Sequence, residues 1–549
     1  MRTLLLTTGL SFLATVAACT DTASELKDPP VLKVTSPKRS LIQDRAGVVI
    51  VTGTVAPNEI SGERVEKVLV NNVQATVSAD GTFTAAVQVQ AGATLLHTTA
   101  RDAAGQEASD TRSVHAGELR PVGANIENAI TAAVSKQAFA KLSAAAGPMI
   151  EGIDMAAMLA PMQPMVHMGD EAGEDCLYAR MYVDDVNMAN AEISLIPTAQ
   201  GLQFRAQIDG LDVPARARYA AACIDGSNTI RVKATRVVVG GTLVVTPSGN
   251  QGFKTTLSNE TVQITGLDIQ ASGIPGSIID LLKLDTVAGF IISKAMPFAM
   301  EPMMNKALGG LGGPQMMDVM GKTLVMEVDP TTIDIDANGA LVTLSTKVLL
   351  SGSESSPGFI FTDNGMPTMD AGTGMQIGLA DDLANEMMAE VTAIGMLNLE
   401  MPAHGGSFDN TKISMTLPPM ISADPADGKM KVLLGDMMAV YTDHGVPVAK
   451  AAISAAIELK VVPASNGYGV ALELGTPVTH VDVLDDVVNT TRLTATDLAK
   501  ATEVCLAGQI TAISKLLTNI PLPAVAGVQM RNMSIGADDG YVMVRGDIE

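Results

Sequence analysis

The sequence predicts an α+β protein in which an N-terminal β-sandwich precedes two lobes of similar plan. Two observations predict this fold class. Residues 31–118 alternate apolar and polar side chains in short runs separated by turn signals, which is typical of a sandwich. Residues 119–549 instead switch twice between helical and strand periods, and a glycine-rich segment at 309–314 divides the two repeats.

The N-terminus has the general form of a secretory signal. Arg2 precedes an apolar stretch, and small residues lead to Cys19. A Cys directly after Val-Ala-Ala resembles the bacterial lipobox, which implies that residues 1–18 are removed and that the Cys19 thiol is diacylated. The alternative is an ordinary signal peptide with an incidental Cys. Thr20 is not the Asp that retains lipoproteins in the inner membrane, so the resemblance implies a lipid anchor in the bacterial outer membrane, at its periplasmic face or on the cell surface.

A tether and a β-sandwich follow the signal. Residues 19–30 are polar and end in Pro-Pro. Within 31–118, runs such as GVVIVTGTV and TAAVQVQAG alternate apolar and polar residues, and Asp80-Gly81 is one of several turn signals between them. The region resembles the immunoglobulin-like modules of bacterial surface proteins, which usually act as spacers.

The first lobe, residues 119–313, is predicted to place strands at roughly 177–270 between two helices. A helix over 125–147 follows from the stripe Ile126, Ile130, Val134, Ala138 and Leu142. A longer helix over 275–308 carries the stripe Ile278, Leu282, Ile291, Ile292, Met296 and Met300.

The second lobe, residues 314–549, is predicted to combine the same kinds of element. Strands at 322–360 precede a helix within 373–397, and strands from 396 to 489 precede a helix over 495–519. The stripe of the first of these helices comprises Leu379, Leu383, Met387 and Val391.

Composition and charge exclude some partners. The chain has 549 residues, of which 47% are hydrophobic and 17% charged, and its formal net charge is −23. A nucleic-acid partner is not expected, because phosphate binding requires a basic surface. After the signal, no stretch reaches about 18 uninterrupted apolar residues, so the body is not expected to span a bilayer. The chain has no Trp but 32 Met, so the adaptable Met side chain must fill much of the core.

Three Cys remain after Cys19. In an oxidising compartment, Cys176 and Cys223 are able to form a disulfide, whereas Cys505 falls in a predicted helix and is expected to be a buried thiol. The sequence leaves the pairing open.

The chain from residue 119 onward resembles the tubular lipid-binding family that includes bactericidal/permeability-increasing protein, lipopolysaccharide-binding protein and cholesteryl ester transfer protein. The resemblance is one of pattern and order, carried by ISLIPTAQGLQF, GIPGSIIDLLKLDTVAGFIISKAMPFAMEPMMNKALGG, MQIGLADDLANEMMAEVTAIGMLNLEMP and NIPLPAVAGVQMRNMSIGADDGYVMVRGDI. It implies that each lobe is a highly curved antiparallel sheet wrapped around a long apolar helix, with a tube open to lipid tails. It also implies that Cys176 and Cys223 form the single disulfide of that family.

The resemblance further implies a lipid or another apolar small molecule as the ligand. The candidate pocket residues are Leu282, Ile291, Met296 and Met300 in the first lobe and Leu379, Leu383, Met387 and Val391 in the second. The alternative is that these stripes close a dry core. The antibacterial members carry a cationic tip for lipopolysaccharide, whereas this chain has 36 Lys and Arg against 59 Asp and Glu. A neutral or zwitterionic lipid, or another apolar molecule, therefore fits better.

Two further patterns suggest metals. The connector 149–170 is rich in thioethers and holds one imidazole, ligands that suit Cu(I); these residues are Met149, Met155, Met158, Met162, Met165, Met168 and His167. We favour an apolar flap, because Met is abundant throughout the chain. The run Asp334–Gly339 begins like a calcium loop, but its twelfth position is Ser345, and a hairpin turn at 337–339 is the better interpretation. No metal site and no cofactor are predicted.

No catalytic motif is present, and none of the six His has a partner at helical spacing. The sequence therefore predicts a non-enzymatic lipoprotein that binds a lipid or another apolar molecule and holds to the membrane through its N-terminal acyl chains. The rival interpretation is a structural or adhesive surface lipoprotein with solid lobes, and copper binding by the Met-rich connector is a weaker third. Protein partners and the oligomeric state stay open.

Overall fold

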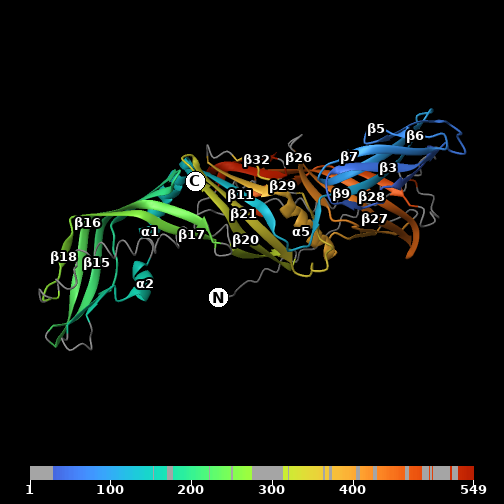
Figure 1. Cartoon of the computed structure of the whole chain (residues 1–549). Coiled ribbons are helices and arrows are strands. Elements are labelled where there is room, and N and C mark those ends of the chain that lie inside the picture. The colour runs from blue at the N-terminus through green and yellow to red at the C-terminus, as the bar shows by residue number, and fades with distance from the viewer. Residues whose placement is uncertain are drawn as a thin grey trace, which may run out of the picture.

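The structure, a computed structural model, describes most of the chain as an elongated molecule made largely of strands (Figure 1). Strands hold 66% of the described residues. The described residues are 29–151, 154–169, 177–221, 223–248, 252–274, 278, 313–319, 321–362, 365–369, 374–402, 408–424, 429–463, 469–484, 494, 498, 502, 520–521, 530–538 and 540–548.

The strands of residues 31–116 form the predicted β-sandwich. In β7, Phe83, Ala85, Val87 and Val89 are buried and the residues between them are exposed, as a half-buried strand requires. One sheet joins β1 (Val31–Ser36), β3 (Gly47–Ala56), β7 (Thr82–Val89) and β6 (Thr76–Val77). The other joins β2 (Leu41–Gln43), β9 (Glu107–Ala116), β8 (Gly92–Asp102), β4 (Val65–Val70) and β5 (Val73–Gln74).

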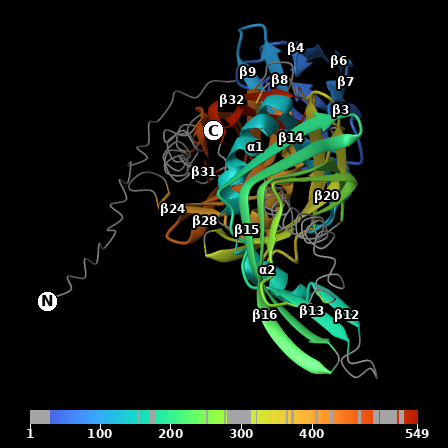
Figure 2. The ribbon, with the colours of Figure 1, turned by 90° about the vertical axis from the view of Figure 1, so that its left-hand side faces the viewer.

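Three sheets form the body that follows the sandwich. The first, which we call the distal sheet, lies at the end of the molecule opposite the sandwich (Figure 1). Helix α1 (Lys136–Glu151) packs along β14, as Figure 2 also shows, and α2 (Met155–Leu159) and a short 3-10 turn (Ala160–Met162) follow it. The sheet joins β12 (Val166–Gly169), β13 (Tyr178–Val183), β15 (Gly201–Ala221), β16 (Ile224–Pro247) and β17 (Phe253–Thr265), with β14 (Asn190–Thr198) on β15 and β18 (Asp268–Gln270) on β16.

The middle of the molecule is a sheet of seven strands, the central sheet. Its order is β19 (Gly313–Val319), β20 (Lys322–Ile335), β21 (Gly339–Leu350), β11 (Ile126–Ser135), β23 (Met375–Ala380), β33 (Tyr541–Ile548) and β32 (Met530–Asp538). Strand β11 comes from the sequence assigned to the first lobe, yet it pairs with β21 and β23 of the second. The two lobes therefore share this sheet.

A third sheet of the body, the junction sheet, carries the sandwich. Strands β8 and β9 of the sandwich contact its strands β27 and β30. It joins β24 (Leu399–Pro402), β25 (Asn410–Ser414), β27 (Lys429–Asp443), β28 (Val446–Pro463), β29 (Gly469–Leu474) and β31 (Ile520–Pro521), with β26 (Met420–Asp424) on β27 and β30 (Val478–Val483) on β28. A two-stranded ribbon of β10 (Glu118–Arg120) and β22 (Phe359–Phe361) lies outside these sheets.

The predicted α+β fold, with each sheet wrapped around a long apolar helix, is wrong. The described residues contain no long apolar helix of that kind, and the longest helices among them are α1, with 16 residues, and α5 (Asp381–Ala393), with 13. The expected helices over 275–308 and 495–519 lie almost wholly outside the described residues.

Two expected helices begin as strands. Residues 126–135 form β11 and residues 375–380 form β23, and α1 and α5 begin directly after them. The two strands are neighbours in the interior of the central sheet, where hydrogen bonds on both edges override the helical spacing of their apolar residues. Leu379, assigned to a helical stripe, is therefore a strand residue.

Candidate functional site

Helix α5 carries three of the four candidate pocket residues that the structure describes, and it lies between two sheets. Its neighbours are β21 of the central sheet, β26 of the junction sheet and β22 of the ribbon. The carboxylates of Asp381 and Asp382 occupy its first turn, where they complement the positive end of the helix dipole.

The polar face of α5 is the buried one. Asp382 accepts hydrogen bonds from the backbone N–H and hydroxyl of Thr362, both at 2.9 Å. The Asn385 amide pairs with the backbone of Ile421, accepting its N–H at 2.7 Å and donating to its carbonyl at 3.1 Å. Glu386 accepts the Gly123 N–H at 2.7 Å. These side chains fasten α5 to three separate backbone segments, which compensates part of the burial of this polar face. One carboxyl oxygen of Glu386 and both of Glu390 are buried without such a bond to any described residue.

Two carboxyl groups on this face have altered acidity. Burial raises the pKa of Glu386 to about 8, and the nearby Glu390 adds to the effect while the Gly123 N–H opposes it. Burial likewise raises the pKa of Glu390 to about 7. The sequence pattern did not identify these residues, because a charged face opposite an apolar stripe usually faces water.

The apolar stripe of α5 is only partly buried. Leu383, Met387 and Val391 pack against Leu324, Val348 and Leu350 of the central sheet but stay partly open to solvent. Ala384 and Met388 are likewise partly buried, and they pack against an apolar cluster on the junction sheet. Three of the four second-lobe candidates thus share one helix face between two apolar surfaces, whereas Leu379 packs from β23 against the main core.

The first-lobe candidates Leu282, Ile291, Met296 and Met300 lie outside the described residues, as does Cys19. One face of β15 in the distal sheet is closed: Val213, Ala215 and Ala217 are at most 4% exposed. Cys223 is disulfide-bonded. Cys176 is outside the described residues, so its pairing with Cys223 stays a prediction.

The connector that suggested copper is a packing element where the structure describes it. Met155 and Met165 are buried in the main apolar core, and Met162 packs against it. The run that begins like a calcium loop is a hairpin turn, as predicted: the Asp336 carboxylate accepts the N–H groups of Asn338 and Gly339 between β20 and β21. Those two bonds lower the pKa of Asp336.

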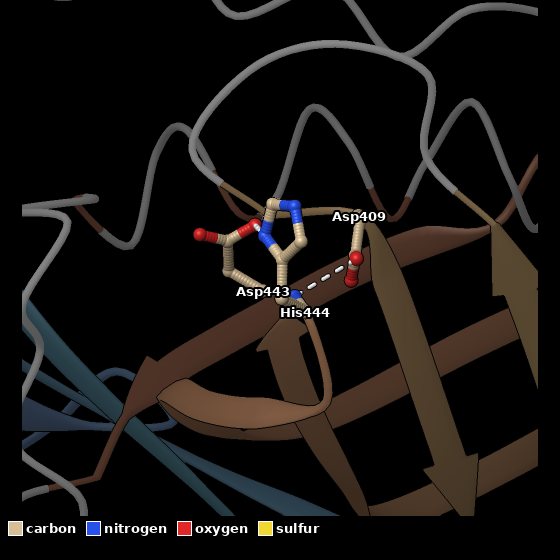
Figure 3. A group of neighbouring side chains, drawn as sticks. All are labelled: Asp409, Asp443 and His444. Carbon is tan, nitrogen blue, oxygen red and sulfur yellow. Dashed lines mark hydrogen bonds and ion pairs between the residues drawn. The ribbon is translucent and has the colours of Figure 1, made fainter.

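One group of possible metal ligands lies on the surface of the junction sheet (Figure 3). The His444 N–H donates to Asp409 at 2.9 Å, and its Nδ1 lies 2.8 Å from an Asp443 oxygen. His444 and Gly445 both have positive φ and form the two-residue turn between β27 and β28. All three ligand candidates are exposed, and closure of this hairpin accounts for their contacts.

A small apolar cavity lies where the sandwich, the ribbon and α5 meet. Its volume is about 30 Å³, which is room for no more than a few water molecules and far too small for an acyl chain. It is lined by Ile42, His115, Leu119, Phe359, Asn385 and Leu417, among others. None of the helices in the described ranges combines the length and hydropathy needed to cross a bilayer.

Comparisons with known proteins agree with the sandwich and give weak likenesses for the whole chain. Residues 30–117 match the family described as glucodextranase, domain B, an immunoglobulin-like β-sandwich. A crystal structure of lipopolysaccharide binding protein is similar with 13% identity and a TM-score of 0.38, covering 77% of this chain and 99% of that one. P47 from Clostridium botulinum A2 is similar with 9% identity and a TM-score of 0.23, covering 76% and 96%. No curated protein sequence matches significantly, and these structural likenesses assign neither ligand nor activity.

Proposed function

We propose that this chain is a lipid-anchored protein of the bacterial outer membrane that binds a lipid or another apolar small molecule beside α5, without covalent chemistry. The observation that carries the proposal is that α5 buries its polar face more fully than its apolar face. Its charged and amide side chains are buried, while Leu383, Met387 and Val391 stay partly open between two apolar surfaces. A helix that only closed a core would bury the apolar face first.

The ligand would be recognised by shape and apolar area. Burial of apolar surface contributes about 25 cal/mol per Å², so a long hydrocarbon chain gains affinity without a polar partner. Met387 and Met388 suit such a ligand because the unbranched thioether adapts to variable shapes. The anchor is supported by the predicted signal peptide, residues 1–18, which ends directly before Cys19.

A structural or adhesive surface protein is the second candidate. The observation in its favour is the closed inner face of the distal sheet at Val213, Ala215 and Ala217. In that case the half-open stripe of α5 would bind nothing.

The two functions are separated by organic extraction and mass spectrometry of the mature chain. Cys19→Ser removes the acylation site, so covalently attached acyl chains do not contribute to the extract. We expect a stoichiometric lipid or other apolar molecule from the first function. A clean extract, together with no uptake of a fluorescent fatty acid, would support the second and refute the first.

The site is tested with two valine variants on the same Cys19→Ser chain. Val391→Ser places a hydroxyl in the stripe and is expected to weaken fatty-acid binding about tenfold. Val446→Ser makes the same change in the exposed hairpin turn region, where the side chain is 62% exposed, and should leave binding unchanged. Equal effects of both variants would place the ligand elsewhere.

A further inference from the structure

The sandwich docks on the junction sheet through buried ionic groups. Arg39, in the loop between β1 and β2, reaches across the junction and donates to Asp436 at 2.9 Å and to Asp482 at 3.2 Å. It also donates to Asp110 of its own sandwich at 3.0 Å. Asp436 and Asp482 are 1% and 8% exposed, so this guanidinium is the cation that compensates two body carboxylates.

Backbone groups of the sandwich bind the same carboxylates. Asp436 accepts the N–H groups of Ser40 at 2.7 Å and Ser113 at 2.9 Å, and Asp482 accepts the Thr111 N–H at 2.9 Å. These bonds exist only while the sandwich is docked. Their amide hydrogens therefore report directly on the junction.

The charges at the junction do not balance when every group is ionised. The carboxylates are those of Asp110, Asp436 and Asp482, and the cations are Arg39 and Arg112, which binds Asp110 at 2.8 Å. One negative charge is left over in a largely buried network. A surplus charge in such surroundings is costly unless a proton neutralises it.

Three imidazoles also face this network. The rings of His97 and His480 face each other across the junction, tilted, with centroids 4.4 Å apart, and His115 is buried near Asp436. Burial lowers the pKa of all three imidazoles, that of His115 to about 4. His480 lowers the pKa of His97 further, whereas the carboxylates of Glu107 and Asp110 oppose the change. They are neutral above pH 7 and do not supply the missing positive charge.

We propose that the sandwich is held by a proton-dependent junction, in which a proton on Asp482 keeps the network balanced and its loss as the pH rises to neutrality weakens the docking of the sandwich on the body. Burial raises the pKa of Asp482 to about 7, although Arg39 opposes the change. A docked form with a raised carboxyl pKa holds its proton more tightly than the separated form. The Asp482 contribution to docking is therefore present at low pH, falls as the pH rises toward about 7, and is constant above that value because both forms have then lost the proton. The three histidines, whose pKa burial lowers, act in the opposite direction below about pH 6.5.

The test is amide hydrogen exchange on the mature Cys19→Ser chain and on its Asp482→Asn variant between pH 5 and 8, corrected for the intrinsic exchange rate. The three histidines are common to both chains, so the ratio of the two protection factors isolates the contribution of Asp482. We expect the protection of Thr111 and Ser113 in the parent, divided by that in the variant, to fall with a slope that approaches tenfold per pH unit up to about pH 6.5 and to level off above about 7. The sandwich-core amide of Val51 in β3 is the internal reference and should keep its protection.

Asp482→Asn keeps the acceptor for Thr111 and Arg39 but removes the charge. We expect it to stay docked and to keep only the pH dependence that the three histidines give, while Asp44→Asn, at an exposed sandwich position, should behave as the parent chain. The proposal is overturned by a ratio of parent to Asp482→Asn protection that does not change between pH 5 and 7. An Asp482→Asn chain that is undocked at every pH overturns it as well.

Discussion

At the scale of single residues, the unexpected feature is the set of acidic side chains turned inward on α5. Sequence reasoning did recover the Asp336 turn, because an Asp followed by Asn-Gly specifies its own local hydrogen bonds. The buried role of Glu386 was not predictable in this way, since its partner Gly123 is distant in the sequence. The local pattern of α5 shows only that one face is charged.

Glu386 makes stability depend on pH. Its pKa is raised from 4.5 to about 8 in the folded chain, so its contribution is fully present below about pH 4.5 and is lost as the pH rises through 8. Glu386→Gln removes this loss and is expected to raise the Tm at pH 8 by about 3 °C or more, with a smaller difference at pH 5. Differential scanning calorimetry at the two pH values measures it.

The matched control for that prediction is Glu327→Gln on β20. This carboxyl is exposed, so the change should leave the Tm almost the same at both pH values. A Tm for Glu386→Gln that is lower than the parent value at pH 8 would mean that the ionised carboxylate stabilises the fold.

At the scale of elements, the spacing of apolar residues along the sequence predicted most strands but failed at β11 and β23. Both carry apolar residues at helical spacing, and both are interior strands of the central sheet, each followed at once by a helix. The repeat that the sequence suggested is therefore present as two strand–helix units whose strands pair with each other. Both strands are buried on both faces for most of their length, so apolar and polar residues do not alternate along them and the sequence shows no strand period there.

The pairing of β11 with β23 requires a residue without a side chain at Gly378. A Cβ there would lie 2.5 Å from the Thr131 hydroxyl oxygen and 3.1 Å from the Met543 sulfur. We expect Gly378→Ala to lower the free energy of unfolding by about 1–3 kcal/mol through overpacking. Denaturant titration measures this change.

Gly536→Ala in the edge strand β32 is the control for Gly378→Ala, because a Cβ there meets no atom within 4 Å. It should be close to neutral. Equal effects of the two changes would show that loss of backbone freedom, and not the contact with Thr131, decides the outcome.

At the scale of the whole molecule, the sequence predicted a sandwich followed by a body, but it treated the sandwich as a spacer. The structure instead seats the sandwich on the junction sheet through Arg39, Asp436 and Asp482 (Figure 1). Arg39 lies 397 and 443 positions from the two aspartates, and each residue alone resembles an ordinary surface charge. Only the fold brings them together in one network, so no local sequence motif predicted the contact between the sandwich and the junction sheet.

The last prediction concerns this arrangement. Arg39→Met keeps much of the aliphatic stem but leaves two buried carboxylates without their cation, a loss that costs about 3–5 kcal/mol in buried pairs. We therefore expect the sandwich to separate from the body at pH 7, with a larger maximum dimension in small-angle scattering and a sandwich that stays folded, since its own apolar core is independent of the junction. Arg45→Met removes an exposed charge a few residues away and should leave the dimension unchanged. If Arg39→Met retained the compact dimension, apolar contacts around Ile42 and Leu417 would have to hold the sandwich by themselves, and the ionic network would be a consequence of docking instead of its cause.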